Sequence, residues 1–112
     1  MAVSRKIRVA IRLDSPSVGA AGYNLRQLAE NPDALAYQER LRQEQQEVIG
    51  RIESATGEPL EVKRRMTRTA NVISAEVRLR DLSLIAAVEG VAGVAAERQY
   101  RIDPPVDRPV TK

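Results

Sequence analysis

The stretch from Ala70 to Ile102 limits the possible folds of this chain more than any other, because it predicts a strand, a short helix and a second strand with very short connections. Apolar and polar residues alternate from Val72 to Arg80, as they do in a strand with one buried face. The face expected to be buried carries Ile73, Ala75, Val77 and Leu79, and the opposite face carries Ser74, Glu76, Arg78 and Arg80.

The helix of this unit is expected directly after the strand. Asp81 occupies the position of an N-cap, where a carboxylate accepts hydrogen bonds from the first free N–H groups. Leu82, Ile85 and Ala86 follow at helical spacing, and Gly90 supplies the left-handed residue that ends a helix. A second alternating run then carries Val91, Val94, Ala96, Tyr100 and Ile102.

The preceding part of the chain predicts two strands and a long helix. Lys6 to Leu13 alternates as a strand, Ala34 to Ala55 has the apolar stripe of a helix, and Glu58 to Met66 alternates again. In this last strand we expect Leu60, Val62 and Met66 to point inward, and Glu61, Lys63 and Arg65 to point outward. Residues 17–33 are expected to form a long loop, with a short helical turn over residues 25–30.

The resulting order of elements, β-α-β-β-α-β, predicts an α+β fold. It is the order of a ferredoxin-like sandwich, in which a four-stranded antiparallel sheet carries two helices on one face. We expect residues 1–102 to form this domain and residues 103–112 to form an extended, proline-rich C-terminal tail.

The composition argues against several classes of function. The chain has no Cys and no His, so it offers no disulfide, no thiolate metal site and no Ser-His-Asp triad. We therefore expect no enzyme activity, no metal, no cofactor and no small-molecule substrate. The net charge of +3 is mild, and with three Tyr as the only aromatic residues the chain lacks the stacking platforms of nucleic-acid binders. No apolar run approaches the roughly 20 residues that span a bilayer, so no membrane contact is expected.

The sheet face without helices is expected to be polar and of mixed charge. It would carry Arg8, Arg12, Lys63, Arg65, Glu76, Arg78, Glu97, Gln99 and Arg101. A metal chaperone of this fold would need a Cys-x-x-Cys loop after the first strand, where this chain has Asp14 to Ser17. A regulatory amino-acid-binding domain stays open on these residues, because the fold alone does not determine function.

Several segments resemble the propeptides of subtilisin-like serine proteases, which are also a family of peptidase inhibitors. Residues 89–101, EGVAGVAAERQYR, are similar to the "PGVxxVEPDRxYR" ending of these propeptides. Residues 36–45, AYQERLRQEQ, are similar to their "AYxxxLxxEQ" helix, and Asn71 to Val77 matches their "NxxSAxV" segment. The resemblance covers roughly Leu35 to Ile102, together with the first strand.

The resemblance implies a binding function without catalysis. In this family the uncovered sheet face docks on two surface helices of the protease, and the residues after the last strand lie in the substrate cleft. For this chain, the resemblance implies that the cleft would receive Tyr100, Arg101, Ile102 and Asp103. Tyr100 and Ile102 are the candidates for the specificity pockets. The docking face would include Glu76, Arg78, Glu97 and Gln99. Glu97 matches one of the two acidic residues that face helix N-termini of the protease, whereas Ala95 replaces the other.

The expected partner is therefore a subtilisin-type serine protease, bound in cis or in trans and inhibited, with its folding assisted as well. The alternative is a ligand-binding or oligomerisation module of the same fold. The location implied is outside the cell or at the cell envelope, together with the protease. The N-terminus MAVSRKIRVAIRL has no apolar segment of the kind found in export signals, so a cytoplasmic location stays open.

Overall fold

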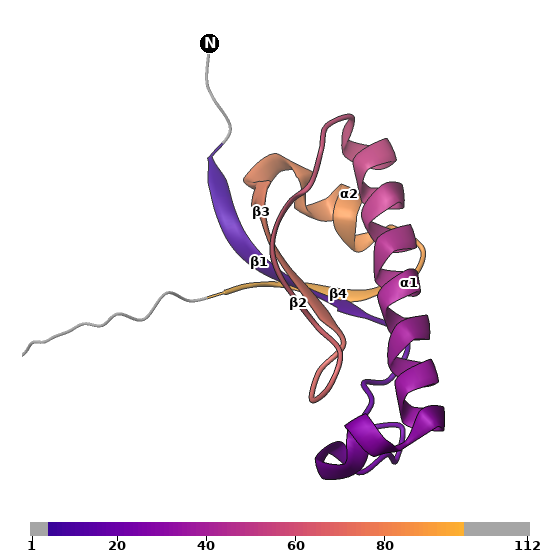
Figure 1. Cartoon of the computed structure of the whole chain (residues 1–112). Helices are drawn as coiled ribbons and strands as arrows, with labels where there is room; N and C mark the ends of the chain where they lie inside the picture. The colour runs from indigo at the N-terminus through magenta and orange to yellow at the C-terminus, as the bar shows by residue number, and fades with distance from the viewer. Residues whose placement is uncertain (1–4, 98–112) are drawn as a thin grey trace, which may run out of the picture.

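Four strands and two α-helices form along residues 5–97, the part of the chain that the computed structural model describes (Figure 1). The sheet is antiparallel and four-stranded, in the order β2-β3-β1-β4, so the fold is α+β. The elements in chain order are β1 (Lys6–Leu13), η1 (Leu25–Glu30), α1 (Pro32–Thr56), β2 (Glu61–Met66), β3 (Val72–Arg78), η2 (Leu79–Asp81), α2 (Leu82–Ala86) and β4 (Val91–Ala96).

The main core lies between one face of the sheet and the two helices α1 and α2. Alternation puts Val9, Ile11 and Leu13 of β1 on this face, beside Ile73, Ala75 and Val77 of β3. The helices cover these side chains with Val48, Ile49 and Ile52 from α1 and with Ile85 from α2. Both helices therefore pack on the same face, and no element within residues 5–97 covers the other face, called the uncovered face below.

Helix α1 has clear start and stop signals. The side chain of Asn31 accepts hydrogen bonds from the N–H groups of Asp33 and Ala34, and Pro32 occupies the first turn. Gly57 ends the helix in the left-handed conformation, with φ of 82°. The helix begins two residues earlier and ends one later than its apolar stripe predicts. Within residues 5–97, no helix combines the length and the apolar character that crossing a membrane requires.

The segment before α1 forms a second apolar cluster rather than an open loop. Val18, Leu28, Ala34 and Leu41 are buried together, and Tyr23, Leu25 and Tyr37 pack around them. The hydroxyl of Tyr37 donates to the carbonyl of Pro16 at 2.7 Å. The short helical turn predicted at residues 25–30 is confirmed as a 3-10 helix. Figure 1 shows the segment from residue 14 to residue 31, called the lobe below, against the first turns of α1.

Strand β2 departs from the predicted alternation because it contains an irregularity. Val62 pairs with Ala75 but Arg64 pairs with Ser74, so the register shifts at Lys63. One extra residue in a strand moves all later side chains to the opposite face. The prediction that Arg65 points outward and Met66 inward is therefore wrong: the Arg65 side chain reaches α1, where it donates to Gln45.

The end of β3 also differs from the prediction. The strand stops at Arg78, and Leu79 lies in the 3-10 turn η2 with a half-exposed side chain instead of in the core. Asp81 makes no capping hydrogen bond, because η2 runs directly into α2 and places Asp81 inside the helical segment. Its carboxylate lies in the first turn of that segment, where a negative charge is favourable to the helix dipole.

Gly90 adopts a φ of 98°, as expected, although α2 ends at Ala86 before it. A side chain there would also collide with α1, since an added Cβ would lie 2.9 Å from Cγ2 of Val48. In β4, Leu13 pairs with Val91 and Arg12 with Gly93, so the register shifts at Ala92. This irregularity lets Val91 and Val94, three residues apart, both pack against the core.

Candidate protein-docking face

The uncovered face of the sheet can be described as three rows that cross all four strands, and the register of the strand pairs defines them. The acidic row consists of Glu61, Glu76, Arg8 and Glu97, where Glu97 joins the sheet by donating its N–H to the carbonyl of Arg8. The small row consists of Arg64, Ser74, Ala10 and Ala95. The apolar row consists of Met66, Val72, Arg12 and Gly93.

Two of the predicted docking residues meet in the acidic row. The guanidinium of Arg8 lies 3.7 Å from the carboxylate of Glu76 on one side and 4.0 Å from that of Glu97 on the other. Both carboxylates thus share one cation, and the trio carries a net negative charge. The Nε atom of Arg8 is buried and has no hydrogen-bond partner among the described residues.

Ser74 fixes the position of Glu97. Its hydroxyl donates to Glu97 Oε2 at 2.8 Å, and the serine itself is only 2% exposed. Sequence reasoning placed Ser74 on the outer face but gave it no role, because the contact joins β3 to the residue after β4 and follows only from the register. Ser74 therefore presents one carboxylate oxygen in a fixed orientation at the end of β4.

Glu61, at the other end of the acidic row, is compensated by two cations. Lys63 Nζ lies 2.9 Å and Lys6 Nζ 3.1 Å from its carboxylate oxygens. The hydrogen bonds from Lys63 and then Lys6 hold the pKa of Glu61 below its usual value. The uncompensated negative charge of this row therefore lies at Glu76, Arg8 and Glu97, next to the point where the chain leaves the sheet.

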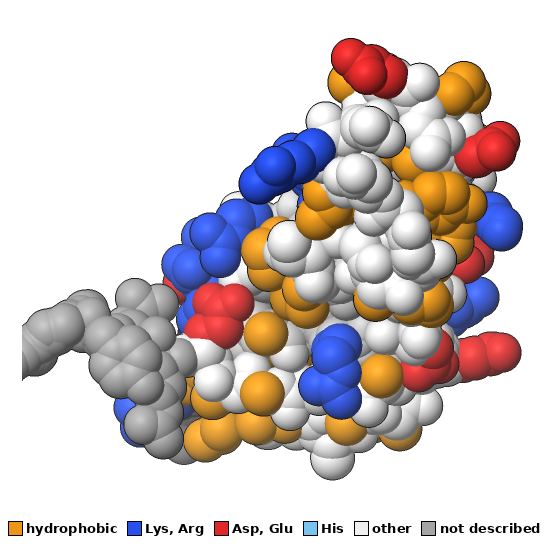
Figure 2. Space-filling view, turned by 90° about the horizontal axis from the view of Figure 1, so that it is seen from below, with side chains coloured by type: hydrophobic (Ala, Val, Ile, Leu, Met, Phe, Trp, Pro, Cys, Tyr) orange, Lys and Arg blue, Asp and Glu red, His pale blue; other side chains and the backbone are white. Residues whose placement is uncertain are grey.

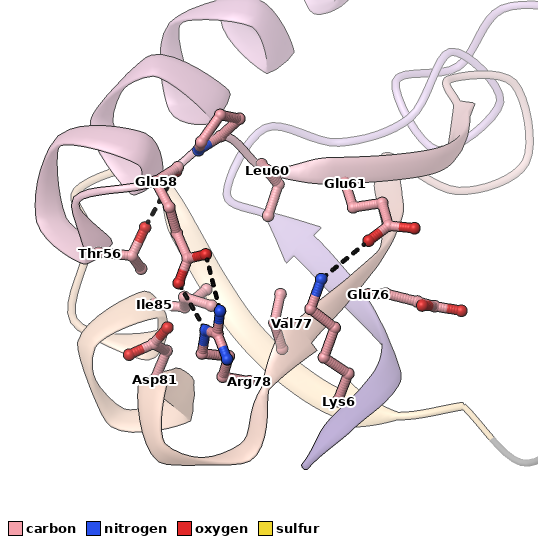
Figure 3. A pocket seen from close by; sticks show the side chains of 11 residues that line it. Lys6, Thr56, Glu58, Leu60, Glu61, Glu76, Val77, Arg78, Asp81 and Ile85 are labelled. Atoms are coloured by element: carbon pink, nitrogen blue, oxygen red, sulfur yellow. Dashed lines mark hydrogen bonds and ion pairs between the residues drawn. The ribbon is translucent and has the colours of Figure 1, made fainter. Parts of the chain in front are cut away.

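Arg78, a third predicted docking residue, lies apart from this group. Its Nε donates to Glu58 Oε2 at 2.7 Å and its Nη2 to Oε1 at 3.3 Å, across the start of the α1–β2 connection. This paired hydrogen bond lowers the pKa of Glu58 and raises that of Arg78. Figure 3 shows Arg78 turned toward Glu58 and Asp81, while Glu76 points elsewhere. The cavity beside this pair, about 30 Å³, has room for a water molecule or two but not for a substrate.

The surface has a mixed character beyond this face. Figure 2 shows basic side chains gathered along one flank with acidic ones beside them, and hydrophobic side chains spread among small and polar ones. The part of the chain from 5 to 97 contains no group of three or more acidic or metal-binding side chains placed to hold a metal ion. The uncovered face carries an open hollow of about 480 Å³ beside the trio, lined by Lys6, Ile7, Arg8, Glu76, Ala96 and Glu97, so it offers charged side chains around an open depression.

The remaining predicted site residues, Gln99 and the four from Tyr100 to Asp103, lie outside the described residues. Glu97 is the last described residue, so the chain that carries them continues from the acidic row.

Comparisons with known proteins add no relative: no family model, no curated protein sequence and no solved structure matches this chain.

Proposed function

We propose that this chain binds and inhibits a subtilisin-type serine protease. The uncovered sheet face docks on the enzyme, and the residues that follow Glu97 enter the substrate cleft. The chain performs no catalysis in this role and needs no cofactor. When it is joined to its protease, the docked domain also assists the folding of the enzyme.

The order of elements and strands supports this proposal. The order β-α-β-β-α-β and the strand order β2-β3-β1-β4 are consistent with a ferredoxin-like sandwich, which is the fold that we propose for this domain. Such a sandwich leaves one sheet face free, and the family that the sequence resembles uses this face for docking. Proteins of this fold have many functions, so the proposal depends mainly on the residues of the uncovered face.

The observation that carries the proposal is the fixed carboxylate of Glu97. A docking acid that faces helix N-termini gains from their free N–H groups and from the helix dipole, by roughly 0.3–2 kcal/mol. Because Ser74 and Arg8 already orient this carboxylate, less side-chain freedom is lost when the partner binds. Glu76 adds a second negative charge on the other side of Arg8.

The sequence after Glu97 suits binding in a cleft. An extended segment that pairs with the edge of a cleft gains main-chain hydrogen bonds for affinity and uses alternate side chains for specificity. Tyr100 and Ile102 are two residues apart, so in an extended segment they point to the same side. Pro104, Pro105 and Pro109 restrict the unbound chain, which reduces the entropy lost on binding.

The proposal is tested by titrating the full chain against a subtilisin-type protease and following the hydrolysis of a chromogenic peptide. We expect saturable inhibition that disappears when the chain is truncated after Arg98, while the circular dichroism spectrum stays unchanged. Glu97→Gln keeps an acceptor for Ser74 but removes the charge, and should raise the inhibition constant roughly three- to thirtyfold.

Glu30→Gln is the matched control, because Glu30 is an exposed carboxylate in η1, far along the chain from the sheet face. It should leave the inhibition constant unchanged. A folded, uncleaved chain that inhibits none of several such proteases would contradict the proposal and favour the ligand-binding or oligomerisation module. Inhibition that survives the truncation would remove the tail from the mechanism.

A further inference from the structure

The apolar row of the uncovered face contains one arginine in an unusual setting. Arg12 lies on β1 directly opposite Gly93 of β4, and opposite Val72 of β3 on its other side. A Cβ atom added to Gly93 would lie 3.1 Å from Nη2 of Arg12 and 3.5 Å from both Cζ and Nη1. The guanidinium of Arg12 therefore lies across the backbone of Gly93, in the space that any other residue would fill with its side chain.

Among residues 5–97 this guanidinium has no acidic partner. Arg8, Arg42, Arg51, Arg78 and Arg80 each have a carboxylate within 4.0 Å, whereas no carboxylate of residues 5–97 lies that close to Arg12. Other exposed arginines, such as Arg26, also lack a carboxylate within this distance among the described residues. What distinguishes Arg12 is that Gly93 provides the space for its guanidinium on the face that we propose to be the docking surface.

We infer that Arg12 is a second docking anchor, which binds an acidic side chain of the protease partner. A guanidinium presents a planar fork that matches a carboxylate with two parallel hydrogen bonds. Arginine is also among the residues that most often dominate binding energy at interfaces, particularly beside apolar neighbours that exclude water. Val72 and Met66 supply such neighbours in the same row.

Glu97, the first docking residue, and Arg12, the second, make the charge of the face different at its two ends. The trio of Glu76, Arg8 and Glu97 is negative at one end of the face, and Arg12 is positive two rows away, with Ala10 and Ala95 between them. A partner that carries helix N-termini at one end and a carboxylate at the other is favoured in a single orientation, because the reversed complex would place like charges together. Arg12 thus selects among proteases that have similar substrate clefts.

The inference rests on the proposed function, and its test uses the same inhibition assay with the full chain. Arg12→Ala should raise the inhibition constant at least about tenfold, and Arg12→Glu should raise it further because it repels the partner's carboxylate. Arg12→Lys keeps the charge but loses the planar pair of donors, so its inhibition constant should lie between those of the wild type and Arg12→Ala. Raising the salt concentration from about 0.1 M to about 1 M should reduce the ratio of the inhibition constants of Arg12→Ala and the wild type, because salt screens the charge of Arg12.

Gly93→Ala tests the placement without changing any charge. Gly93 has no positive φ, so alanine is compatible with its backbone, but the new methyl group must displace the guanidinium. We expect a weaker complex and an unchanged melting curve. Arg26→Ala removes an arginine that lies outside the sheet face, in η1, and should inhibit like the wild type.

The outcomes separate the two claims. If the wild type inhibits and Arg12→Ala is no weaker than Arg26→Ala, the second anchor is overturned while the proposed function stands. If Arg12→Ala weakens inhibition but Gly93→Ala does not, the anchor is supported and its placement by Gly93 is overturned. A folded wild-type chain that inhibits no subtilisin-type protease overturns both.

Discussion

Replacing Gln45 should destabilise the fold more than any other substitution of a polar residue on α1. The Gln45 side chain is completely buried and makes three hydrogen bonds. Its Nε2 donates to the carbonyl of Met66 at 2.7 Å and to Oδ1 of Asn71 at 2.9 Å, and its Oε1 accepts from Nε of Arg65 at 2.9 Å. The side chain thus joins α1 to the end of β2 and to the start of β3.

The expected cost follows from the groups left behind. Each hydrogen bond contributes about 0.5–1.5 kcal/mol net, and an abandoned buried group costs about 1–3 kcal/mol. Asn71 is 4% exposed, so water cannot easily replace its lost partner, whereas Arg65 is exposed and can be solvated. We therefore expect Gln45→Ala to lower the free energy of unfolding by about 2–4 kcal/mol. For a domain of this size, such a loss lowers Tm by about 10–20 °C.

Urea unfolding followed by far-UV circular dichroism measures this difference, since the chain has no Trp for a fluorescence signal. Gln43→Ala is the matched control, because Gln43 is an exposed glutamine on the same helix and should change the free energy by less than about 0.5 kcal/mol. A loss below about 1 kcal/mol for Gln45→Ala would refute the reasoning that this network is closed to water.

Two further predictions concern the loop glycines and the dependence of stability on pH. Gly90→Ala should lower the free energy of unfolding by about 2–3 kcal/mol, because Gly90 has a positive φ and the added Cβ would lie 2.9 Å from Val48. Gly57→Ala should lower it by only about 1 kcal/mol, because Gly57 also has a positive φ but has open space around it. Equal urea midpoints for the two variants would contradict the predicted clash with Val48. The pKa of Glu58 is lowered in the folded state by the hydrogen bond from Arg78, so this pair stabilises the fold above the usual pKa of a glutamate and the effect disappears as the pH falls through the lowered value. The stability of Glu58→Gln should therefore fall below that of the wild type at neutral pH and converge with it in acid, and a difference that persists at low pH would show that Glu58 acts through something other than its charge.

The sequence predicts the framework of the fold where alternation is regular. In β1, strict alternation places Val9 and Ile11 in the core, and the structure agrees. In β2 the same reasoning fails for Arg65, because a single extra residue at Lys63 reverses the faces. Its mark in the sequence is Arg64, a charged residue at a position where strict alternation expects an apolar one. Asp81 occupies the N-cap position of α2, as predicted, but its side chain makes no capping hydrogen bond, because the 3-10 turn η2 directly precedes the helix.

The candidate site is predictable only in part. That Glu76 lies on the uncovered face follows from the pattern of β3, but its shared contact with Arg8 and Glu97 depends on the strand order. The glycine opposite Arg12 is visible only once the shift at Ala92 sets the register of β4. Buried polar residues such as Gln45 are equally hard to find, because a glutamine in a helix gives no sign of which partners it will meet.

Along α1, the buried polar side chain of Gln45 lies between Leu41 of the second apolar cluster and Val48 of the main core. Gln38 bonds to Thr67 and Gln45 bonds to Asn71. Because the two clusters are separate, we expect the segment before α1 to open locally without exposing the apolar side chains beneath the sheet. Amide hydrogens of η1 should exchange with solvent faster than those of β1 and β3, so loss of the lobe would leave the docking face formed.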